Sequence, residues 1–264
     1  MLLAGRSVLL TGATGGLGHA IAAAVAARGA RLVLSGRKRE MLEELAASLP
    51  DAVAAAADLT DPASLRALVE AHPNVDVVVA NAGMPGSGTL DSFAEEEIDR
   101  VLEVNLRAPI MLARLYVPRM RARGSGHLVL MSSLSGRAPV AGGALYSATK
   151  FGLRGFGASL RADLRGTGVS VSIVSPGFVH EAGMFADSGA ALPTGFRTVS
   201  PEQVADATIS AIERDRSEVT VAPLELRLGT TLAAMAPELA SRMATKLGGD
   251  RVAERMAEGQ ADKR

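Results

Sequence analysis

The sequence predicts a single α/β domain of the Rossmann type: a doubly wound parallel sheet of about seven strands with helices on both faces. Three observations predict it. Short apolar segments alternate with helical segments of ten or more residues, which is typical of βαβ units. Several of these apolar segments are almost uninterrupted, as strands buried on both faces are. No internal repeat or low-complexity linker divides residues 1–264, so we expect one domain.

The first half of the chain starts with an apolar run that leads directly into glycines. An alanine-rich helix follows and ends before Gly29. Ala52–Ala57 would equally suit a helix, and only its place in the alternation favours a strand. Asp61 is the expected N-cap of a helix with Pro62 at its first position. The predicted strands are Ser7–Thr11, Arg31–Ser35, Ala52–Ala57 and Val75–Ala80, and the predicted helices are Leu17–Arg28, Lys38–Leu49 and one that begins at Asp61-Pro62.

The second half continues the alternation and adds two further segments. An irregular stretch rich in Gly, Pro and Ser, about residues 178–200, is long enough to be a lid. A helical C-terminal extension, about residues 224–264, follows, and its highly charged last dozen residues are expected to fray. The predicted strands are Gly126–Ser132, Val169–Ser175 and Glu218–Val221, and the predicted helices are Glu95–Arg123, Ala144–Gly166 and Glu202–Arg214. In the extension, apolar residues recur at roughly helical spacing: Leu228, Leu232, Leu239, Met243 and Leu247.

The composition excludes several classes of protein. The chain has 28 basic and 28 acidic residues, whereas a nucleic-acid or anionic-membrane surface needs an excess of Lys and Arg. There is no cysteine and the four histidines are scattered, so we expect neither disulfides nor a metal site. No apolar run approaches the roughly 20 residues of a membrane span, and the start of the chain does not resemble a signal peptide. We therefore expect a cytoplasmic protein that binds neither nucleic acid nor membranes.

A glycine-rich turn joins the first strand to the first helix. It reads TGATGGLG over residues 11–18 and satisfies two spacings, one through Gly12, Gly16 and Gly18 and the other through Gly12, Gly15 and Gly18. In this position the glycines allow backbone N–H groups and a helix N-terminus to approach a pyrophosphate. The alternative is an ordinary glycine-rich turn, but its place after the first strand of an α/β pattern favours a dinucleotide site.

The end of the second strand bears on the choice of dinucleotide. NAD sites place a carboxylate there, whereas an Arg accommodates the 2′-phosphate of NADP. Here the sequence is Gly36-Arg37-Lys38, with two cations and no carboxylate. Both cations could simply be the solvated start of a helix, but cations are unfavourable at a helix N-terminus. The sequence thus favours NADP(H) over NAD(H).

Ser133, Tyr146 and Lys150 form a candidate catalytic group. Lys150 follows Tyr146 by four residues, which places both side chains on one helix face. A neighbouring ammonium favours the phenolate, so we expect a lowered pKa for Tyr146 and a role as general acid or base. Ser133 ends the fifth strand, where open α/β sheets bind ligands, and its hydroxyl could donate to the same substrate oxygen. The alternative for Tyr146 is a half-buried helix tyrosine.

Taken together, these motifs resemble the short-chain dehydrogenase/reductase family in its compact single-domain branch, over roughly Ser7 to Val221. The matching residues, in the order and approximate spacing that the family uses, are TGATGGLG (11–18), Asp58, Asn81-Ala82-Gly83, Asn105, Ser133, Tyr146 with Lys150, and Pro176-Gly177. Asn81-Ala82-Gly83 and the short step from Ser133 to Tyr146 favour the compact branch over the longer epimerase-like one, which settles the glycine spacing as Gly12, Gly16 and Gly18.

The resemblance implies roles for further residues. Lys150 would also hold the nicotinamide ribose, and Asn105 would hold a water that links Lys150 to solvent. Asp58 would lie beside the adenine, Asn81 and Gly83 would line the cofactor floor, and Asn81 would also stabilise the sheet. A capping role for Asp58, a turn at Asn81–Gly83 and an ordinary polar helix position for Asn105 are the simpler alternatives. The complete set expected to contact the cofactor is Gly12, Thr14, Gly15, Gly16, Leu17, Gly18, Gly36, Arg37, Lys38, Asp58, Leu59, Asn81, Ala82, Gly83, Tyr146, Lys150, Pro176, Gly177 and Val179.

One position departs from the family pattern. The family usually has a threonine five residues beyond the proline of Pro176-Gly177, where it helps fix the nicotinamide carboxamide, and this chain has Glu181 there. Val179 could still reach the carboxamide through its backbone, whereas Ser188 and Thr194 are not expected to replace the threonine. The geometry of the cofactor in this loop is therefore open.

The predicted function is NADP(H)-dependent interconversion of a ketone or aldehyde with an alcohol, with Tyr146 as acid/base. The alternative is a cofactor-binding sensor or scaffold without turnover, which has no need of an acid/base tyrosine. The substrate is expected to be a small molecule, either in an apolar pocket or beside apolar side chains that only pack the lid: Phe178, Met184, Phe185, Leu192 and Val140. The resemblance favours a homodimer or homotetramer through the two long helices, where small residues would permit close contact: Gly152, Gly155, Gly157 and Ala158.

Overall fold

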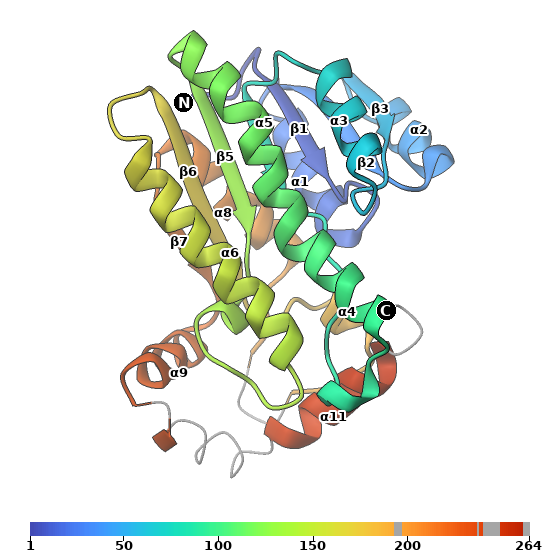
Figure 1. Ribbon diagram of the computed structural model, residues 1–264, viewed down its shortest axis with the longest axis vertical. Coiled ribbons are helices and arrows are strands. Elements are labelled where there is room, and N and C mark those ends of the chain that lie inside the picture. Colours follow the sequence, from blue (N-terminus) through green and yellow to red (C-terminus); the bar gives the residue numbers. More distant parts are fainter. Residues whose placement is uncertain (193–196, 237, 240–248, 261–264) are drawn as a thin grey trace.

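The computed structural model describes residues 1–192, 197–236, 238–239 and 249–260 (Figure 1). Seven strands form one parallel sheet in the order β3-β2-β1-β4-β5-β6-β7, which confirms the predicted fold class. The first strand lies near the middle and the chain winds outward from it in both directions. The strands are β1 (Ser7–Thr11), β2 (Arg31–Gly36), β3 (Ala52–Ala56), β4 (Val77–Ala80), β5 (Gly126–Met131), β6 (Val169–Pro176) and β7 (Glu218–Val221).

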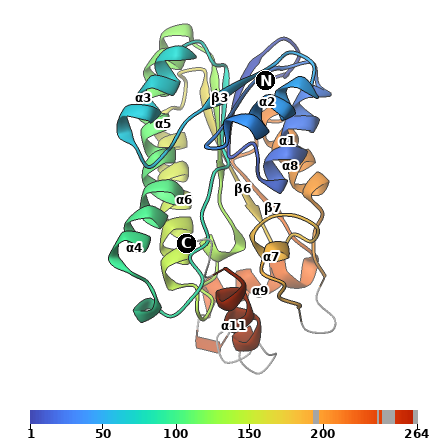
Figure 2. The ribbon, with the colours of Figure 1, turned by 90° about the vertical axis from the view of Figure 1, so that its right-hand side faces the viewer.

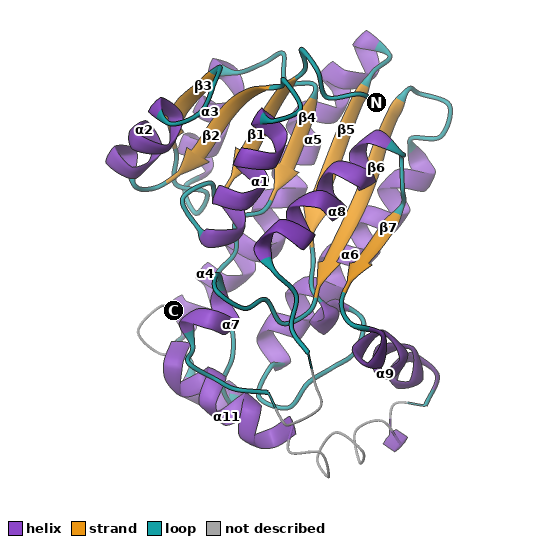
Figure 3. Ribbon diagram, turned by 180° about the vertical axis from the view of Figure 1, so that it is seen from behind, coloured by secondary structure: helices purple, strands orange, loops and turns teal. Residues whose placement is uncertain are grey.

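Helices cover both faces of the sheet, and Figure 2 shows the sheet edge-on between them. One layer contains α3 (Pro62–Ala71), α4 (Glu95–Leu102), α5 (Ala108–Arg123) and α6 (Ala144–Asp163). The other contains α1 (Gly16–Ala26), α2 (Arg39–Ala47) and α8 (Pro201–Glu213). Among the described residues, helices α7 (Met184–Asp187), α9 (Leu224–Met235) and α11 (Gly249–Gln260) lie beyond the carboxyl ends of the strands (Figure 3).

Strand β1 shows why the central strands are apolar throughout. Val8 and Leu10 point into the cluster under α1, α2 and α8, whereas Leu9 between them points into the cluster under α3 and α5. All three are fully buried. Because alternate side chains point to opposite faces and both faces are covered, no position in such a strand favours a polar residue.

The alanine segment forms an edge strand, as its place in the alternation predicts. β3 pairs in parallel with β2, with Ala52 opposite Leu32 and Ala56 opposite Gly36. Alanine has a high intrinsic helix propensity. The backbone pairing offered by β2 outweighs this preference, which is the usual result when local propensity and tertiary context disagree.

The helix predicted over Glu95–Arg123 is not continuous. A π-helical turn, η2 (Glu103–Arg107), separates α4 from α5. Asn105 lies in this turn with no exposed surface, and its side chain accepts from Met84 N at 2.7 Å and donates to Met84 O at 2.9 Å. Helix periodicity predicts neither these hydrogen bonds to a neighbouring loop nor the π-helical turn that contains Asn105.

The C-terminal extension is helical in α9 and α11, but the expected fraying of its last residues is wrong as far as Gln260. Val252 and Gln260 are buried, whereas Glu254, Arg255 and Glu258 are exposed. The charges lie on the solvent side of an amphipathic helix, so a charged composition does not prevent docking. Met243 and Leu247 lie outside the described residues. Across the part of the chain that the structure describes, no helix combines the length and apolar character needed to cross a membrane.

Candidate active site

The sequence-predicted residues come from separate motifs and meet at the carboxyl end of the sheet. The glycine-rich turn follows β1, Asn81–Gly83 follows β4, Ser133 follows β5 and Gly177 follows β6. Helix α6 brings Tyr146 and Lys150 to the same end. This edge, below the strand tips in Figure 1, is where doubly wound sheets bind ligands.

The glycine-rich turn has the close packing that a dinucleotide cradle needs. Gly12 has φ +66°, and a β-carbon there would lie 2.7 Å from the Cα of Ala82. A β-carbon on Gly18 would overlap the carbonyl oxygen of Gly12, so the start of α1 packs directly on the turn. Helix α1 has no side-chain cap and no acidic residue in its first turn. Its first N–H groups are therefore suited to an anion.

Asn81 and Thr11 connect the turn to the neighbouring strand. Asn81 Nδ2 donates to the carbonyl oxygens of Thr11 at 3.1 Å and Gly12 at 3.2 Å. The buried Thr11 hydroxyl accepts from the backbone of Asn81 at 3.1 Å and of Ala82 at 3.2 Å. Asn81 thus uses its amide to fix the backbone of the glycine-rich turn. Thr11 performs a related task that we did not predict, although it opens the glycine motif.

The adenosine end of the predicted site is open and positively charged. Arg37 and Lys38 are exposed at the start of α2, and neither forms a salt bridge within the described ranges. A β-carbon on Gly36 would lie 3.4 Å from Thr14 Oγ1, so β2 ends directly beside the glycine-rich turn. Asp58 is exposed and accepts from the backbone and hydroxyl of Thr60 at 2.9 and 2.8 Å, and Leu59 is buried. Asp61, not Asp58, caps α3.

Tyr146, Ser133 and Lys150 lie together. The Ser133 side chain lies close enough to Tyr146 to affect its pKa, and the Lys150 ammonium lies 5.4 Å from the centre of the Tyr146 ring. Lys150 is 3% exposed and donates to Met131 O at 2.9 Å. A β-carbon on Gly83 would lie 3.9 Å from Lys150 Nζ and 3.4 Å from Asn105 Oδ1. Lys150 and Asn105 therefore lie side by side next to Gly83, and Tyr146 and Ser133 lie beside Lys150.

The electrostatics of this group correct one expectation. Burial raises the pKa of Tyr146 to about 12, and the hydrogen bond with Ser133 opposes the rise only in part. Burial also lowers the pKa of Lys150 to about 8. The predicted fall in the pKa of Tyr146 does not occur in this structure, because removal from water disfavours the charged form of both groups.

The first part of the lid forms a short bridge with its last part. Val199 N donates to Phe178 O at 2.9 Å and His180 N donates to Val199 O at 3.0 Å. In this parallel pairing the N–H and C=O of Val179 itself point to the opposite side. Glu181 has φ +67° and an exposed side chain beside His180, and Ala182 packs on Gly16. Ser188 bonds within the lid to Phe185 O, and Thr194 lies outside the described residues.

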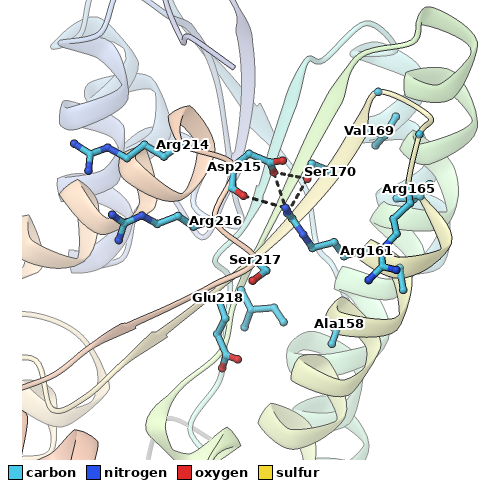
Figure 4. A pocket seen from close by; sticks show the side chains of 15 residues that line it. Ala158, Arg161, Arg165, Val169, Ser170, Arg214, Asp215, Arg216, Ser217 and Glu218 are labelled. Atoms are coloured by element: carbon cyan, nitrogen blue, oxygen red, sulfur yellow. Dashed lines mark hydrogen bonds and ion pairs between the residues drawn. The ribbon is translucent and has the colours of Figure 1, made fainter.

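A large groove lies at the other end of the sheet and does not include the predicted site. It has a volume of about 1030 Å³ and is lined by the end of α6, the start of β6 and the turn before β7. In Figure 4 Arg161 crosses it to reach Ser170 and Asp215. These polar groups satisfy one another, so the groove has a structural explanation.

Comparison with known proteins identifies the family. The family model for short chain dehydrogenases matches residues 6–192, a range that contains the glycine-rich turn, the catalytic group and the first part of the lid. The chain belongs to the short-chain dehydrogenase/reductase family. This confirms the resemblance inferred from the motifs, and the protein is an oxidoreductase of that family.

Relatives within the short-chain dehydrogenase/reductase family span most of the chain. The ketoacyl reductase HetN of Nostoc sp. is 37% identical over 83% of this chain and 79% of its own. The 1-deoxy-11-beta-hydroxypentalenate dehydrogenase of Streptomyces avermitilis is 38% identical over 87% of this chain and 89% of its own. A short-chain dehydrogenase from Sphingobium yanoikuyae, solved in complex with NADPH, superposes with a TM-score of 0.77 at 29% identity, covering 91% and 95% of the two chains.

Several residues around this short-chain dehydrogenase site escaped the sequence analysis. Glu218 of β7 binds Arg137, four residues after Ser133, and Arg154, four residues after Lys150. The four-residue spacing of Arg154 from Lys150 indicates that both lie on one face of α6, but nothing in the sequence indicates that Arg154 binds Glu218. Of the small residues expected between chains, Gly157 instead packs on Leu130 and Ile173 of its own sheet.

Proposed function

We propose that this protein reduces a ketone or aldehyde with NADPH, or oxidises the corresponding alcohol with NADP⁺, using Tyr146 as general acid/base. The observation that carries the proposal is the grouping of Tyr146, Ser133 and the buried Lys150 at the same sheet edge as an uncapped, glycine-lined helix N-terminus. A sensor without turnover has no need of this arrangement.

The residues present fit a nicotinamide dinucleotide. The uncapped N–H groups of α1 suit the pyrophosphate, and the N–H and C=O of Val179, which have no hydrogen-bond partner among the described residues, suit a carboxamide. Lys150 lies close enough to Gly83 to bind the nicotinamide ribose. When bound, NADPH supplies the hydride.

The protein residues then handle the substrate oxygen and its proton. In reduction the Tyr146 hydroxyl donates its proton to the oxygen, while the Ser133 hydroxyl donates a hydrogen bond to the same atom. The high pKa of Tyr146, about 12, keeps it protonated at neutral pH, which is the form that reduction needs. Oxidation needs the phenolate, so we expect the rate of alcohol oxidation to rise with pH.

The test is NADPH oxidation by wild type and Tyr146→Phe with a panel of ketones, aldehydes and diketones. Tyr146→Phe should lower kcat/KM by roughly 10²- to 10⁴-fold, the usual contribution of a positioned proton donor, and bind NADPH within a few-fold of wild type. Tyr116→Phe is a matched control, because the Tyr116 hydroxyl donates to His72 O at 3.0 Å in the core. Binding of NADPH by wild type without any turnover would instead favour the sensor or scaffold function.

We also propose that Arg37 selects NADP(H) by binding its 2′-phosphate. Arg37→Ala should weaken NADPH binding about 10- to 100-fold, the range for a charge-assisted hydrogen bond, and leave NADH binding nearly unchanged. Arg39→Ala is the control, because Arg39 lies two residues on and pairs with Glu43 at 3.7 Å. Both affinities are measured by calorimetric titration. An equal loss of affinity for NADPH and NADH in Arg37→Ala would contradict the proposal that Arg37 binds the 2′-phosphate.

A further inference from the structure

Helix α11 bridges two segments that flank the candidate site. Near its start, the Cβ of Ala253 lies 3.3 Å from the position of a β-carbon on Gly142, in the loop between Ser133 and Tyr146. Near its end, Gly259 packs so tightly on Ser188 that a β-carbon would overlap the Ser188 carbonyl oxygen. Figure 3 shows α11 beside α7, beyond the strand tips. The helix therefore spans from the loop before the catalytic tyrosine to the lid.

Gln260 fixes the lid end of this bridge. Its Nε2 donates to the carbonyl oxygen of Met184 at 2.9 Å, and the residue is 1% exposed. Helix α7 is only four residues long, Met184–Asp187. A helix this short has little stability of its own, so its position depends on tertiary contacts such as this one.

Met184 carries the contact into the catalytic centre. Its methyl carbon lies 3.2 Å from the position of a β-carbon on Gly83, and Asn105 Oδ1 lies 3.4 Å from the same position. A continuous path of contacts thus runs from Gln260 through Met184 to the volume that Lys150 and Asn105 surround.

The two segments that Gln260 joins, α11 and the lid, both carry apolar side chains. On α11, Val252 is buried and Ala253 and Met256 are half-buried, whereas Glu254, Arg255 and Glu258 are exposed. On the lid, the rings of Phe178 and Phe185 pack with their centres 4.8 Å apart. The lid carboxylates Glu181 and Asp187 are exposed. Such walls recognise hydrocarbon and exclude a charged substituent.

We propose that α11 forms the outer wall of the substrate site and limits it to uncharged, compact apolar carbonyl compounds, with Gln260 as the positioning residue that holds Met184 over the catalytic centre. The claim about substrates rests on the proposed function, whereas the claim about the lid does not. Gln260 acts only through Met184 and takes no part in proton transfer.

The test compares wild type with Gln260→Met, which keeps the volume and burial of the side chain but removes the donor. Hydrogen exchange of the backbone amides in residues 182–190 should be about three- to tenfold faster in the variant, the change expected from one hydrogen bond. The ratio of kcat/KM for acetophenone to kcat/KM for butanone should rise about threefold or more, because a less firmly held Met184 leaves more room for the larger ketone. Glu258→Gln on the exposed side of α11 should change neither quantity.

Each outcome decides part of the proposal. Equal lid exchange in wild type and Gln260→Met would overturn the positioning role of Gln260. Faster exchange with an unchanged ratio of the two ketones would overturn the role of α11 in selecting substrates. If wild type itself reduces neither ketone nor any other carbonyl compound, the proposed function fails, and the exchange measurement still decides the lid contact.

Discussion

At the scale of the residue, Lys150 opposes the stability of the fold that contains it. It is 3% exposed, its ammonium has one backbone acceptor, and burial lowers its pKa to about 8. In the unfolded chain a lysine pKa is about 10.4. At neutral pH the protein must therefore bury a charge that the unfolded chain keeps in water, and this destabilises the native state.

We predict that Lys150→Met increases the free energy of unfolding at pH 7 by about 1 to 3 kcal/mol while it abolishes turnover. The penalty is fully present below the folded pKa of about 8 and disappears as the pH rises past the unfolded pKa. Urea unfolding at pH 7 and near pH 10.5 should therefore show a larger gain at the lower pH. Lys38→Met, at an exposed lysine, should show no such dependence on pH. A destabilised Lys150→Met at pH 7 would contradict the prediction.

At the scale of the element, Glu218 joins β7 to the two segments that carry the proposed catalytic residues. Its carboxylate accepts from Arg137 Nη1 at 2.5 Å and from Arg154 at 2.7 and 3.2 Å. Arg137 follows η3 (Leu134–Gly136), whose N-cap is Ser133, and Arg154 belongs to α6. Burial alone would raise the pKa of Glu218, but hydrogen bonds and charge from Arg154 and Arg137 lower it overall. One carboxylate thus joins the edge strand to the two segments that present Ser133, Tyr146 and Lys150.

We predict that Glu218→Gln lowers the free energy of unfolding by about 1 to 3 kcal/mol, the range for charge-assisted hydrogen bonds. Because the pKa of Glu218 is lowered in the folded state, its contribution is complete above the ordinary glutamate pKa and is lost as the pH falls through the folded one. The difference between wild type and variant should therefore shrink in acid. Thermal melts of wild type and variant over a range of pH measure this difference. Glu43→Gln, which breaks an exposed pair with Arg39, should lower the free energy of unfolding by at most about 0.5 kcal/mol in these melts.

The elements also show where periodicity stops being informative. The alternation of strands and helices predicted β3 despite its alanines, because one more strand was needed between two crossovers. The same periodicity missed the interruption at Asn105. The sequence does not show whether a polar residue in a helix faces solvent or bonds to a buried loop. Here Asn105 bonds to the backbone of Met84.

At the scale of the whole molecule, the parallel sheet explains why the site was predictable. Motifs far apart in sequence each follow a strand, and parallel strands end at one edge, so Gly12, Asn81 and Ser133 had to meet. The spacing of Tyr146 and Lys150 on one helix supplied the rest. The contact between Gln260 and Met184 joins two segments outside the strand pattern, 76 residues apart. Neither periodicity nor spacing constrains such a pair, so only the structure shows it.

The π-helical turn at Glu103–Arg107 makes residue count, as well as residue identity, a property of the active site. A π turn is a local widening of an α-helix that takes up one additional residue. Deleting one residue from this segment would leave every motif in place, yet the wide turn that directs the Asn105 amide at Met84 could not form. An alignment that closes a gap here would thus lose the position that Asn105 occupies, and an engineer who replaces the turn with regular α-helix would remove that amide from Met84.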